Sequence, residues 1–227
     1  MGVVRLKGVY MIDFALCICS YGNITDGTVQ SLEFFRKTVP YRYELRVLSG
    51  DALIGRSRSR MCTQFLKCND APYLIFIDSD ILFSPGDIED IYRALMTGKH
   101  CVAGAYSVGN GAHLAIRTYD EILWDGTIQE AEYVSTGFLG ISRWLLEKIK
   151  DELSLPLLHE GSDMECYPFF ESGRCEEHPD FYISEDWNFC DKVRKVGRKV
   201  YVHTGVQVGH IKNAVITVND VLGKKEV

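Results

Sequence analysis

The amino-acid sequence predicts an α/β fold, a single domain in which a mostly parallel central sheet is flanked by helices. Two observations predict this class: apolar strand-like runs alternate with helix-like segments, and 227 residues suit one such domain. A third observation locates a candidate site, because Asp78 and Asp80 directly follow the most hydrophobic run, YLIFI. Ligands of open α/β sheets bind outside the carboxyl ends of strands. We therefore expect this acidic pair to mark the functional edge of the sheet.

Strands and helices alternate through the first half of the chain. Apolar runs closed by turn residues predict strands, and apolar residues three or four apart predict helices. Pro40 follows one predicted helix and Pro85 lies in the first turn of another, as these boundaries prefer. We predict strands over 14–19, 43–48, 73–77 and 101–105, and helices over 28–38, 54–68 and 85–96.

This alternation breaks after residue 105. We expect loops and short strands over 106–136, and a long irregular segment over 154–182 that resembles a lid or a binding loop. The remaining predicted elements are short strands in 113–119 and 132–135, helices over 143–151 and 185–196, and strands near 199–202 and 207–211. We divide the chain into a leader or extension (1–11), a domain (12–212) and a tail that can link to a further domain (213–227).

Composition and charge exclude several classes of function. The formal net charge of -6 argues against a nonspecific nucleic-acid binder. None of the eight cysteines forms a CxxC pair, which favours buried, reduced thiols over disulfides or a zinc site. No apolar run reaches the length of a membrane span, and the first residues lack the apolar core of a signal peptide. We expect a cytoplasmic protein without a nucleic-acid partner or a membrane span.

The acidic pair has the chemistry of a hard-cation site. Alternation along a strand points Asp78 and Asp80 the same way. Two carboxylates so close repel each other unless a cation or hydrogen-bond donors lie between them. Mg²⁺ or Mn²⁺ held by carboxylates and a substrate diphosphate fits this arrangement. The alternative is an aspartate that caps a turn, and the position after the third strand of the series favours the cation site.

A basic turn, GRSRSRM, precedes the acidic pair. Arg56 and Arg60 are four residues apart and share a helix face, whereas Arg58 falls nearer the apolar stripe. Arginine forks match phosphate oxygens, and a helix N-terminus favours anions. A solvated basic turn is the alternative, but the position between the second strand and the acidic pair favours phosphate binding.

Later residues complete the candidate site. Glu185 and Asp186 open a helix, where they either cap it or act as a general base toward an acceptor hydroxyl. His210 ends the last strand; a lone histidine is usually structural, although neutral imidazole binds Mn²⁺ well. Residues 136–140 either line an acceptor site or supply turn glycines. Aromatic residues suit core filling or sugar stacking: Tyr167, Phe169, Phe170, Phe181, Tyr182 and Trp187.

As a set, these pieces resemble a family-2-like, nucleotide-sugar-dependent glycosyltransferase of the GT-A fold. The resemblance extends over roughly residues 12–212, includes enzymes of large algal DNA viruses, and depends on the combination rather than on any single stretch. The stretches that carry it are CICSYGN (17–23), GRSRSRM (55–61), YLIFIDSDILF (73–83), YVSTGFLGISR (133–143), SEDWNFCDKVRKVG (184–197) and VGHI (208–211).

The resemblance implies a Rossmann-like domain that transfers a hexosyl group from a nucleotide sugar, usually a UDP-sugar, to a hydroxyl of a glycan or glycoprotein. It implies Mn²⁺ or Mg²⁺ bound by Asp78, Asp80 and His210, and Asp186 or Glu185 as the base if the enzyme inverts configuration. If configuration is retained, these two carboxylates only position substrate. The implied nucleotide contacts are Ser20, Tyr21, Asp51, Arg56, Arg60, Asp78 and Ser79.

The sequence departs from the family pattern at two turns, and two other functions compete. Ser20-Tyr21 stands where proline is frequent, and Ser49-Gly50-Asp51 replaces an Asp-Asp-Gly type turn, which weakens the nucleotide assignments. A nucleotidyltransferase that makes the activated sugar usually has a basic, Gly-rich first loop, but SYGNITDGT (20–28) contains no Lys or Arg. A nucleotide-sugar-binding module without turnover would retain binding alone.

Overall fold

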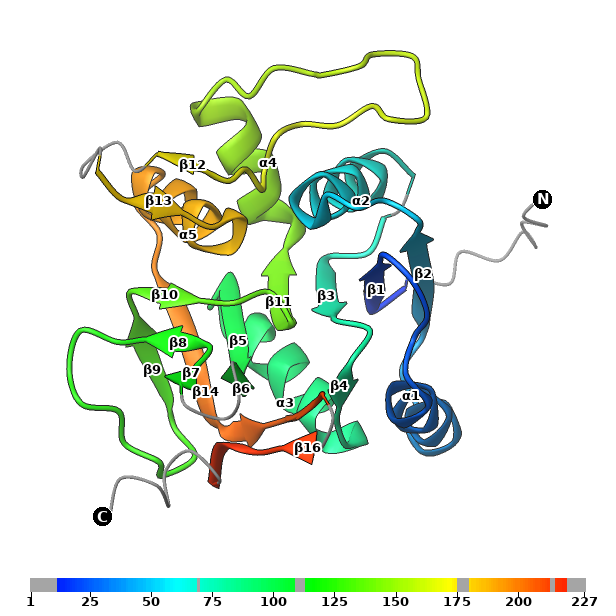
Figure 1. The fold of residues 1–227 in the computed structure, drawn as a ribbon, viewed down its shortest axis with the longest axis vertical. Coiled ribbons are helices and arrows are strands. Elements are labelled where there is room, and N and C mark those ends of the chain that lie inside the picture. The colour runs from blue at the N-terminus through cyan, green and yellow to red at the C-terminus, as the bar shows by residue number, and fades with distance from the viewer. Residues whose placement is uncertain (1–11, 69, 109–112, 175–179, 213–214, 220–227) are drawn as a thin grey trace.

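A seven-stranded sheet forms the centre of the computed structural model (Figure 1), which describes residues 12–219 apart from 69, 109–112, 175–179 and 213–214. The predicted leader, 1–11, lies outside the described residues. The sheet order is β2-β1-β3-β11-β5-β14-β9. Its strands are β1 Phe14–Ser20, β2 Tyr43–Ser49, β3 Tyr73–Ile77, β5 Cys101–Ala105, β9 Ile128–Ala131, β11 Phe138–Ser142 and β14 Val200–Gln207.

The sheet is mixed but mostly parallel. Strands β2, β1, β3, β5 and β14 run in one direction, whereas β11 and β9 are antiparallel to their neighbours. The helices are α1 Asp26–Thr38, α2 Ile54–Cys68, α3 Pro85–Met96, α4 Arg143–Glu152 and α5 Glu185–Lys195. This architecture confirms the predicted α/β class, and the predicted helices and core strands of the first half agree with it closely.

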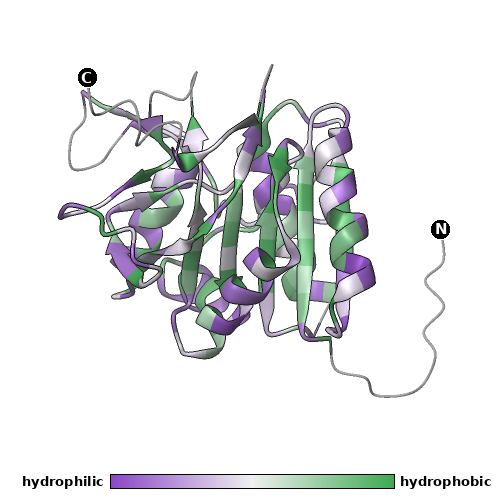
Figure 2. Ribbon diagram, turned by 90° about the horizontal axis from the view of Figure 1, so that it is seen from below, coloured by the Kyte–Doolittle hydropathy of each residue, from purple (hydrophilic) through white to green (hydrophobic). Residues whose placement is uncertain are grey.

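The helices form two layers, one on each face of the sheet. Helices α1 and α3 pack on one face, against Phe14, Leu16 and Ile18 of β1. Helices α2, α4 and α5 pack on the other face, against Ala15 and Cys17. Figure 2 shows hydrophobic residues concentrated along the central strands. Strands covered on both faces need apolar side chains on both, which explains their continuous apolar runs.

Strand β11 differs from the expectation that residues 136–140 line an acceptor site or serve a turn. It lies in the middle of the sheet, antiparallel between β3 and β5. Gly140 lies within this strand because a side chain there would meet Ile91 and Leu95 of α3; a Cβ atom would approach them to 2.5 and 2.8 Å. The glycine therefore serves close packing of α3 on the sheet.

A small antiparallel sheet folds the C-terminal segment back onto the acidic turn. Strand β15 (Gly209–Ile211) lies between β4 (Ile81–Leu82) and β16 (Val215–Ile216), and His210 is in register with Ile81. Residues 215–218 belong to the predicted tail, yet β16 pairs with the domain and Val218 is 1% exposed. This fold-back places the end of the chain beside the residues that follow β3.

Short strands complete the second half of the domain. They are β6 Ser107–Val108, β7 His113–Leu114, β8 Ile116–Arg117, β10 Tyr133–Val134, β12 Gly173–Arg174 and β13 Tyr182–Ile183. The long segment after α4 is anchored near its middle to side chains of α2. The Tyr167 N–H donates to the Thr63 hydroxyl, and the Phe170 N–H donates to the Ser59 hydroxyl, which in turn donates to the Phe170 carbonyl. Within the described part of the chain, no helix has the length and apolar character that crossing a membrane requires.

We predict that Gly140→Ala destabilises the protein by about 1–3 kcal/mol, the usual cost of overpacking a core. The new methyl group would press on Ile91 and Leu95. Urea unfolding measures the change. Gly173→Ala is the control, because a Cβ atom at Gly173 would meet no atom within 4 Å. Equal midpoints for the two variants would contradict this account of β11.

Candidate functional site

The predicted site residues gather at one edge of the sheet. Ser20 ends β1, Asp51 follows β2 and Asp78 follows β3; these three strands are parallel neighbours, so their carboxyl ends coincide. The Ser20 hydroxyl closes its own turn by donating to the Gly22 carbonyl at 3.0 Å. Tyr21 projects outward and is 73% exposed. The Tyr21 side chain is therefore open to a ligand, as are the neighbouring residues Gly22 and Asn23.

The acidic turn is held in place by the start of α1. Backbone N–H of Thr25 and the hydroxyl of Thr28 donate to the Ser79 carbonyl at 2.9 and 3.1 Å. On its other side, the Ile211 N–H donates to the Asp80 carbonyl at 2.7 Å. The backbone of Ser79 thus binds α1, and Asp80 is tied to β15.

Asp80 and His210 form a close pair. The Nε2 atom of His210 lies 3.2 Å from Oδ2 of Asp80, and its Nδ1 lies 2.7 Å from the Ser107 carbonyl. A carbonyl only accepts hydrogen bonds, so Nδ1 carries a proton and, in the neutral ring, Nε2 presents a lone pair to the carboxylate. The Nζ of Lys212 is 3.0 Å from the same carboxylate oxygen. Two acceptors that face each other require a second ring proton or a cation between them.

This pair fits the divalent cation that the resemblance implies. A carboxylate and an imidazole whose other nitrogen donates to a carbonyl are a typical ligand arrangement. Burial lowers the pKa of His210, but the contacts with Asp80 and Ser107 outweigh it and the pKa is raised overall. Among the described residues, no three His, Cys, Asp or Glu side chains gather into one metal site. Asp78, predicted as the third ligand, makes a different contact.

Asp78 shares a buried arginine with Glu185. The Nη2 of Arg58 lies 2.9 and 3.1 Å from the two carboxylate oxygens of Asp78, and its Nη1 lies 2.7 Å from Oε1 of Glu185. Arg58 is 5% exposed. Asp78 is also fixed through its backbone, because its N–H donates to the Gly137 carbonyl at 2.8 Å. Asp78, Glu185 and Arg58 therefore form one ionic cluster.

The two arginines predicted to bind phosphate are paired with Asp51. Arg56 forms a bidentate contact with the Asp51 carboxylate, at 2.9 and 2.7 Å. Arg60 lies 3.5 Å from that carboxylate and also donates to the Asp163 carbonyl at 2.8 Å. The hydrogen bond from Arg56 is the main cause that lowers the pKa of Asp51 to about 2, against the opposing effect of burial. Arg56, 37% exposed at its side chain, remains accessible to solvent.

Asp186 differs from its neighbour Glu185. Its Oδ1 accepts the Trp187 N–H at 2.9 Å and the Ser184 hydroxyl, whereas its Oδ2 accepts no hydrogen bond within the described structure. Burial raises the pKa of Tyr106, and the charges of Asp78 and Asp186 raise it further. The charge of Asp186 therefore acts on the Tyr106 hydroxyl, although burial and Asp78 contribute more to the shift.

The aromatic residues separate into two groups. Phe169 and Phe170 are buried in the core, at 0% and 2% exposure. Trp187 stacks on Tyr133, with 4.3 Å between ring centroids. Core filling is thus confirmed for the first two. Phe181 and Tyr182, just before α5, are 71% and 76% exposed.

Sequence reasoning missed three polar residues of this site. The sequence places Arg58 near the apolar stripe of its helix. That position was the signal for a buried ion pair, because an arginine that is buried needs a buried partner. Lys212 and Tyr106 carry no comparable local signal. Tyr106 accepts the Gly137 N–H at 3.0 Å and packs edge-on against the His210 ring.

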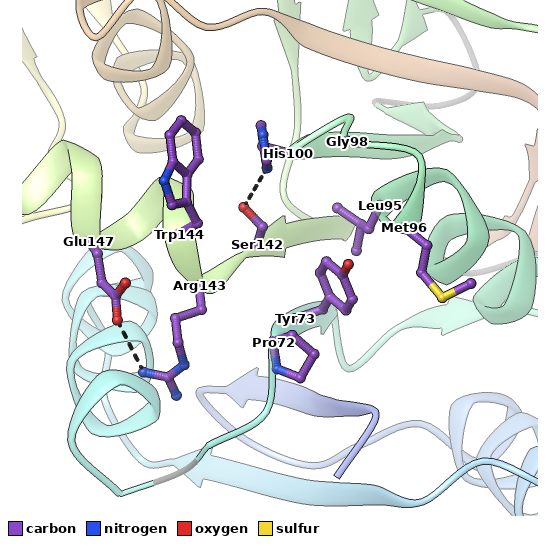
Figure 3. A pocket seen from close by; sticks show the side chains of 10 residues that line it. All are labelled: Pro72, Tyr73, Leu95, Met96, Gly98, His100, Ser142, Arg143, Trp144 and Glu147. Atoms are coloured by element: carbon purple, nitrogen blue, oxygen red, sulfur yellow. Dashed lines mark hydrogen bonds and ion pairs between the residues drawn. The ribbon is translucent and has the colours of Figure 1, made fainter. Parts of the chain in front are cut away.

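A pocket of about 300 Å³ lies at the opposite end of β3 (Figure 3). Ser142 of β11 is in register with Tyr73, the first residue of β3, so the pocket is far along the strand from Asp78. Trp144 in this pocket is engaged by the His100 ring at 4.4 Å and by the Arg198 guanidinium at 4.7 Å. None of the predicted site residues lines it.

Comparisons with known proteins agree with this fold. The family model of glycosyl transferase family 2 matches residues 8–150. No curated protein matches the chain. Among solved structures, A197 from STIV is similar at a TM-score of 0.64 and 19% sequence identity, over 92% of this chain and 92% of that one. At this identity the structural likeness shows the fold alone.

We predict that Asp51→Asn lowers stability at pH 7 by about 2 kcal/mol, because the carboxylate loses its contact with Arg56. The folded pKa of Asp51, about 2, lies below its ordinary value of 3.8, so the unfolded state binds more protons between these values. The Asp51 carboxylate therefore adds to the free energy of unfolding above pH ~4, and this stabilisation is lost as pH falls through ~2.

Urea unfolding of wild type and Asp51→Asn from pH 7 to pH 2 measures this contribution. The difference between the two proteins should shrink across that window. The exposed Asp120→Asn is the matched control and should follow wild type at every pH. A constant difference between wild type and Asp51→Asn would disprove the ionic origin of the effect.

Proposed function

The chain belongs to glycosyl transferase family 2, and from this premise we propose that it transfers a sugar from a nucleotide-sugar donor, a UDP-sugar, to a hydroxyl of a glycan or glycoprotein. The observation that carries the proposal is the Asp80–His210 pair, 3.2 Å apart, beside the cluster of Asp78, Arg58 and Glu185. One edge of the sheet thereby combines a pair suited to a cation with an ionic cluster next to Asp186, the neighbour of Glu185 in the chain. The free thiols of the described cysteines fit a cytoplasmic location.

The donor would bind between the turns that follow β1, β2 and β3. The exposed ring of Tyr21 and the Arg56 side chain, 37% exposed, are accessible side chains of this region. We assign Asp80 and His210 as protein ligands of Mn²⁺ or Mg²⁺, with Asp78 close by. The bound ion would supply a Lewis acid that stabilises negative charge on the departing diphosphate.

The acceptor side would use Asp186. Its Oδ2 is open to accept a proton from the acceptor hydroxyl as the hydroxyl oxygen attacks the anomeric carbon and the bond to the diphosphate breaks. The Oδ1 atom is held by Ser184 and the Trp187 N–H, which orients the carboxylate. Glu185 is occupied by Arg58. We therefore propose Asp186, rather than Glu185, as the base of an inverting reaction.

We predict that UDP or GDP binds with micromolar affinity only with Mn²⁺ present, and that Asp80→Asn or His210→Gln weakens binding at least about tenfold. Isothermal titration calorimetry with each nucleotide, with and without Mn²⁺, measures this. Asp151→Asn, an exposed change on α4, is the control and should bind as wild type. Binding that ignores both the metal and Asp80 would overturn the proposed donor site.

We predict that Asp186→Asn lowers sugar transfer by about 10²–10⁴-fold, the usual contribution of a general base. Nucleotide affinity should change less than about twofold, because Asp186 lies on the acceptor side. The assay is release of UDP or GDP from a panel of nucleotide sugars in the presence of glycan acceptors. Asp191→Asn, on the same helix and paired with Arg194, is the control.

The outcomes of that assay separate the competing functions. Transfer that survives Asp186→Asn would show that another group is the base. Nucleotide binding without turnover by wild type, on every donor and acceptor tried, would favour a binding module. Formation of a nucleotide sugar from a nucleoside triphosphate would instead favour the nucleotidyltransferase alternative.

A further inference from the structure

Arg58 joins three segments that are distant in the sequence. It is 20 positions from Asp78 and 127 positions from Glu185, and it contacts both through one guanidinium. Its side chain is 6% exposed, compared with 27% for Asp78 and 16% for Glu185. Two carboxylates of the proposed donor and acceptor sides are therefore held by a single buried cation.

The first turns of α2 make further contacts with the segment that leads into α5. Ser59 accepts the Phe170 N–H at 2.9 Å. A Cβ atom at Gly55 would lie 3.1 Å from Cβ of Glu185 and 3.0 Å from the Phe170 carbonyl. Gly55 and Arg58 are three residues apart and so share a face of the helix. This face therefore contacts Glu185 in two ways: Gly55 packs closely against it, and Arg58 forms an ion pair with it.

Stability alone is a poor explanation for such a cluster. Taking an arginine out of water is costly, and well-packed apolar residues often serve a core equally well. The Nε of Arg58 is buried without a hydrogen-bond partner in the described structure, which adds to the cost. The effect of the cluster is geometric, because the planar guanidinium of Arg58 fixes the separation and direction of two carboxylates.

Fixing Glu185 also orients Asp186. Successive residues of an α-helix point about 100° apart around its axis. If Glu185 is held against Arg58, the first turn of α5 has one rotational setting and Asp186 has one direction. Loss of the Arg58 contact would free that turn without touching Asp186 itself.

We propose that Arg58 is a positioning residue. It fixes the position of Asp78, on the donor side, relative to Glu185, on the acceptor side, and through Glu185 it fixes the direction of the Asp186 side chain. The proposal rests on the proposed function for the meaning of the two sides. The ionic cluster and the close approach of Gly55 rest on the structure alone.

The experiment compares four variants of the full chain: Arg58→Gln, Arg58→Lys, Gly55→Val and Arg143→Gln. Arg143 is the matched control, an arginine of α4 with a 19% exposed side chain that donates to the carbonyls of Phe65, Leu66 and Ala71. Three quantities are measured at 15 °C: UDP affinity with Mn²⁺, amide hydrogen exchange over 184–189, and the urea midpoint. Circular dichroism shows which variants are folded.

Arg58→Gln should raise exchange over 184–189 and weaken UDP binding, each by about tenfold or more. Arg58→Lys keeps the charge without the fork and should fall between Arg58→Gln and wild type. Gly55→Val should displace Glu185, raising exchange of 184–189 with UDP affinity changed less than about twofold. Arg143→Gln should lower the urea midpoint and leave the other two quantities unchanged.

A folded Arg58→Gln that behaves like Arg143→Gln would overturn the proposal, because Arg58 would then be a stabilising residue only. If Arg58→Gln does not fold, Arg58→Lys decides: exchange over 184–189 equal to that of wild type contradicts the positioning role, and raised exchange supports it. If wild type binds neither UDP nor GDP, the proposed donor site fails. The exchange comparison still tests the positioning role in that case.

Discussion

Carboxylates at the end of a buried strand require positive partners, and the arrangement of this site follows from that requirement. A half-buried carboxylate that has lost water must be paired with a cation or with hydrogen-bond donors. Here Asp51 meets Arg56 and Asp78 meets Arg58. Asp80 meets His210 together with Lys212. The pairing of each aspartate therefore decides which groups remain open to a ligand.

The fold brings these partners together by three separate devices. Helix α2 follows β2 directly and brings Arg56 and Arg58 to the carboxyl edge of the sheet. Strand β15 pairs with β4 and returns His210 to Asp80, although 130 positions separate them. Strand β11, antiparallel between β3 and β5, places Gly137 against the backbone of Asp78. Strands of the main sheet position the ends of β2 and β3, and strand pairing in the small C-terminal sheet returns His210, so the site depends on both sheets.

Much of the fold could be predicted because local patterns agree with it. The run 73–77 and the helices 54–68 and 85–96 have the predicted boundaries, since apolar periodicity and turn residues specify them locally. Strand 138–142 was missed for a physical reason: its five residues, FLGIS, include a glycine, which typically signals a turn. Only the neighbouring α3 shows why Gly140 is needed there.

For the site, the sequence by itself determined the chemical types and their places on strand and helix ends. The family resemblance added Asp78, Asp80 and His210 as metal ligands, and Glu185 or Asp186 as the base. Only the tertiary structure decided that Asp80 faces His210, and that Arg58 occupies Asp78 and Glu185 together. The reason is that ion pairing among half-buried groups depends on distances across the fold, and no local pattern encodes a contact between residues 127 positions apart.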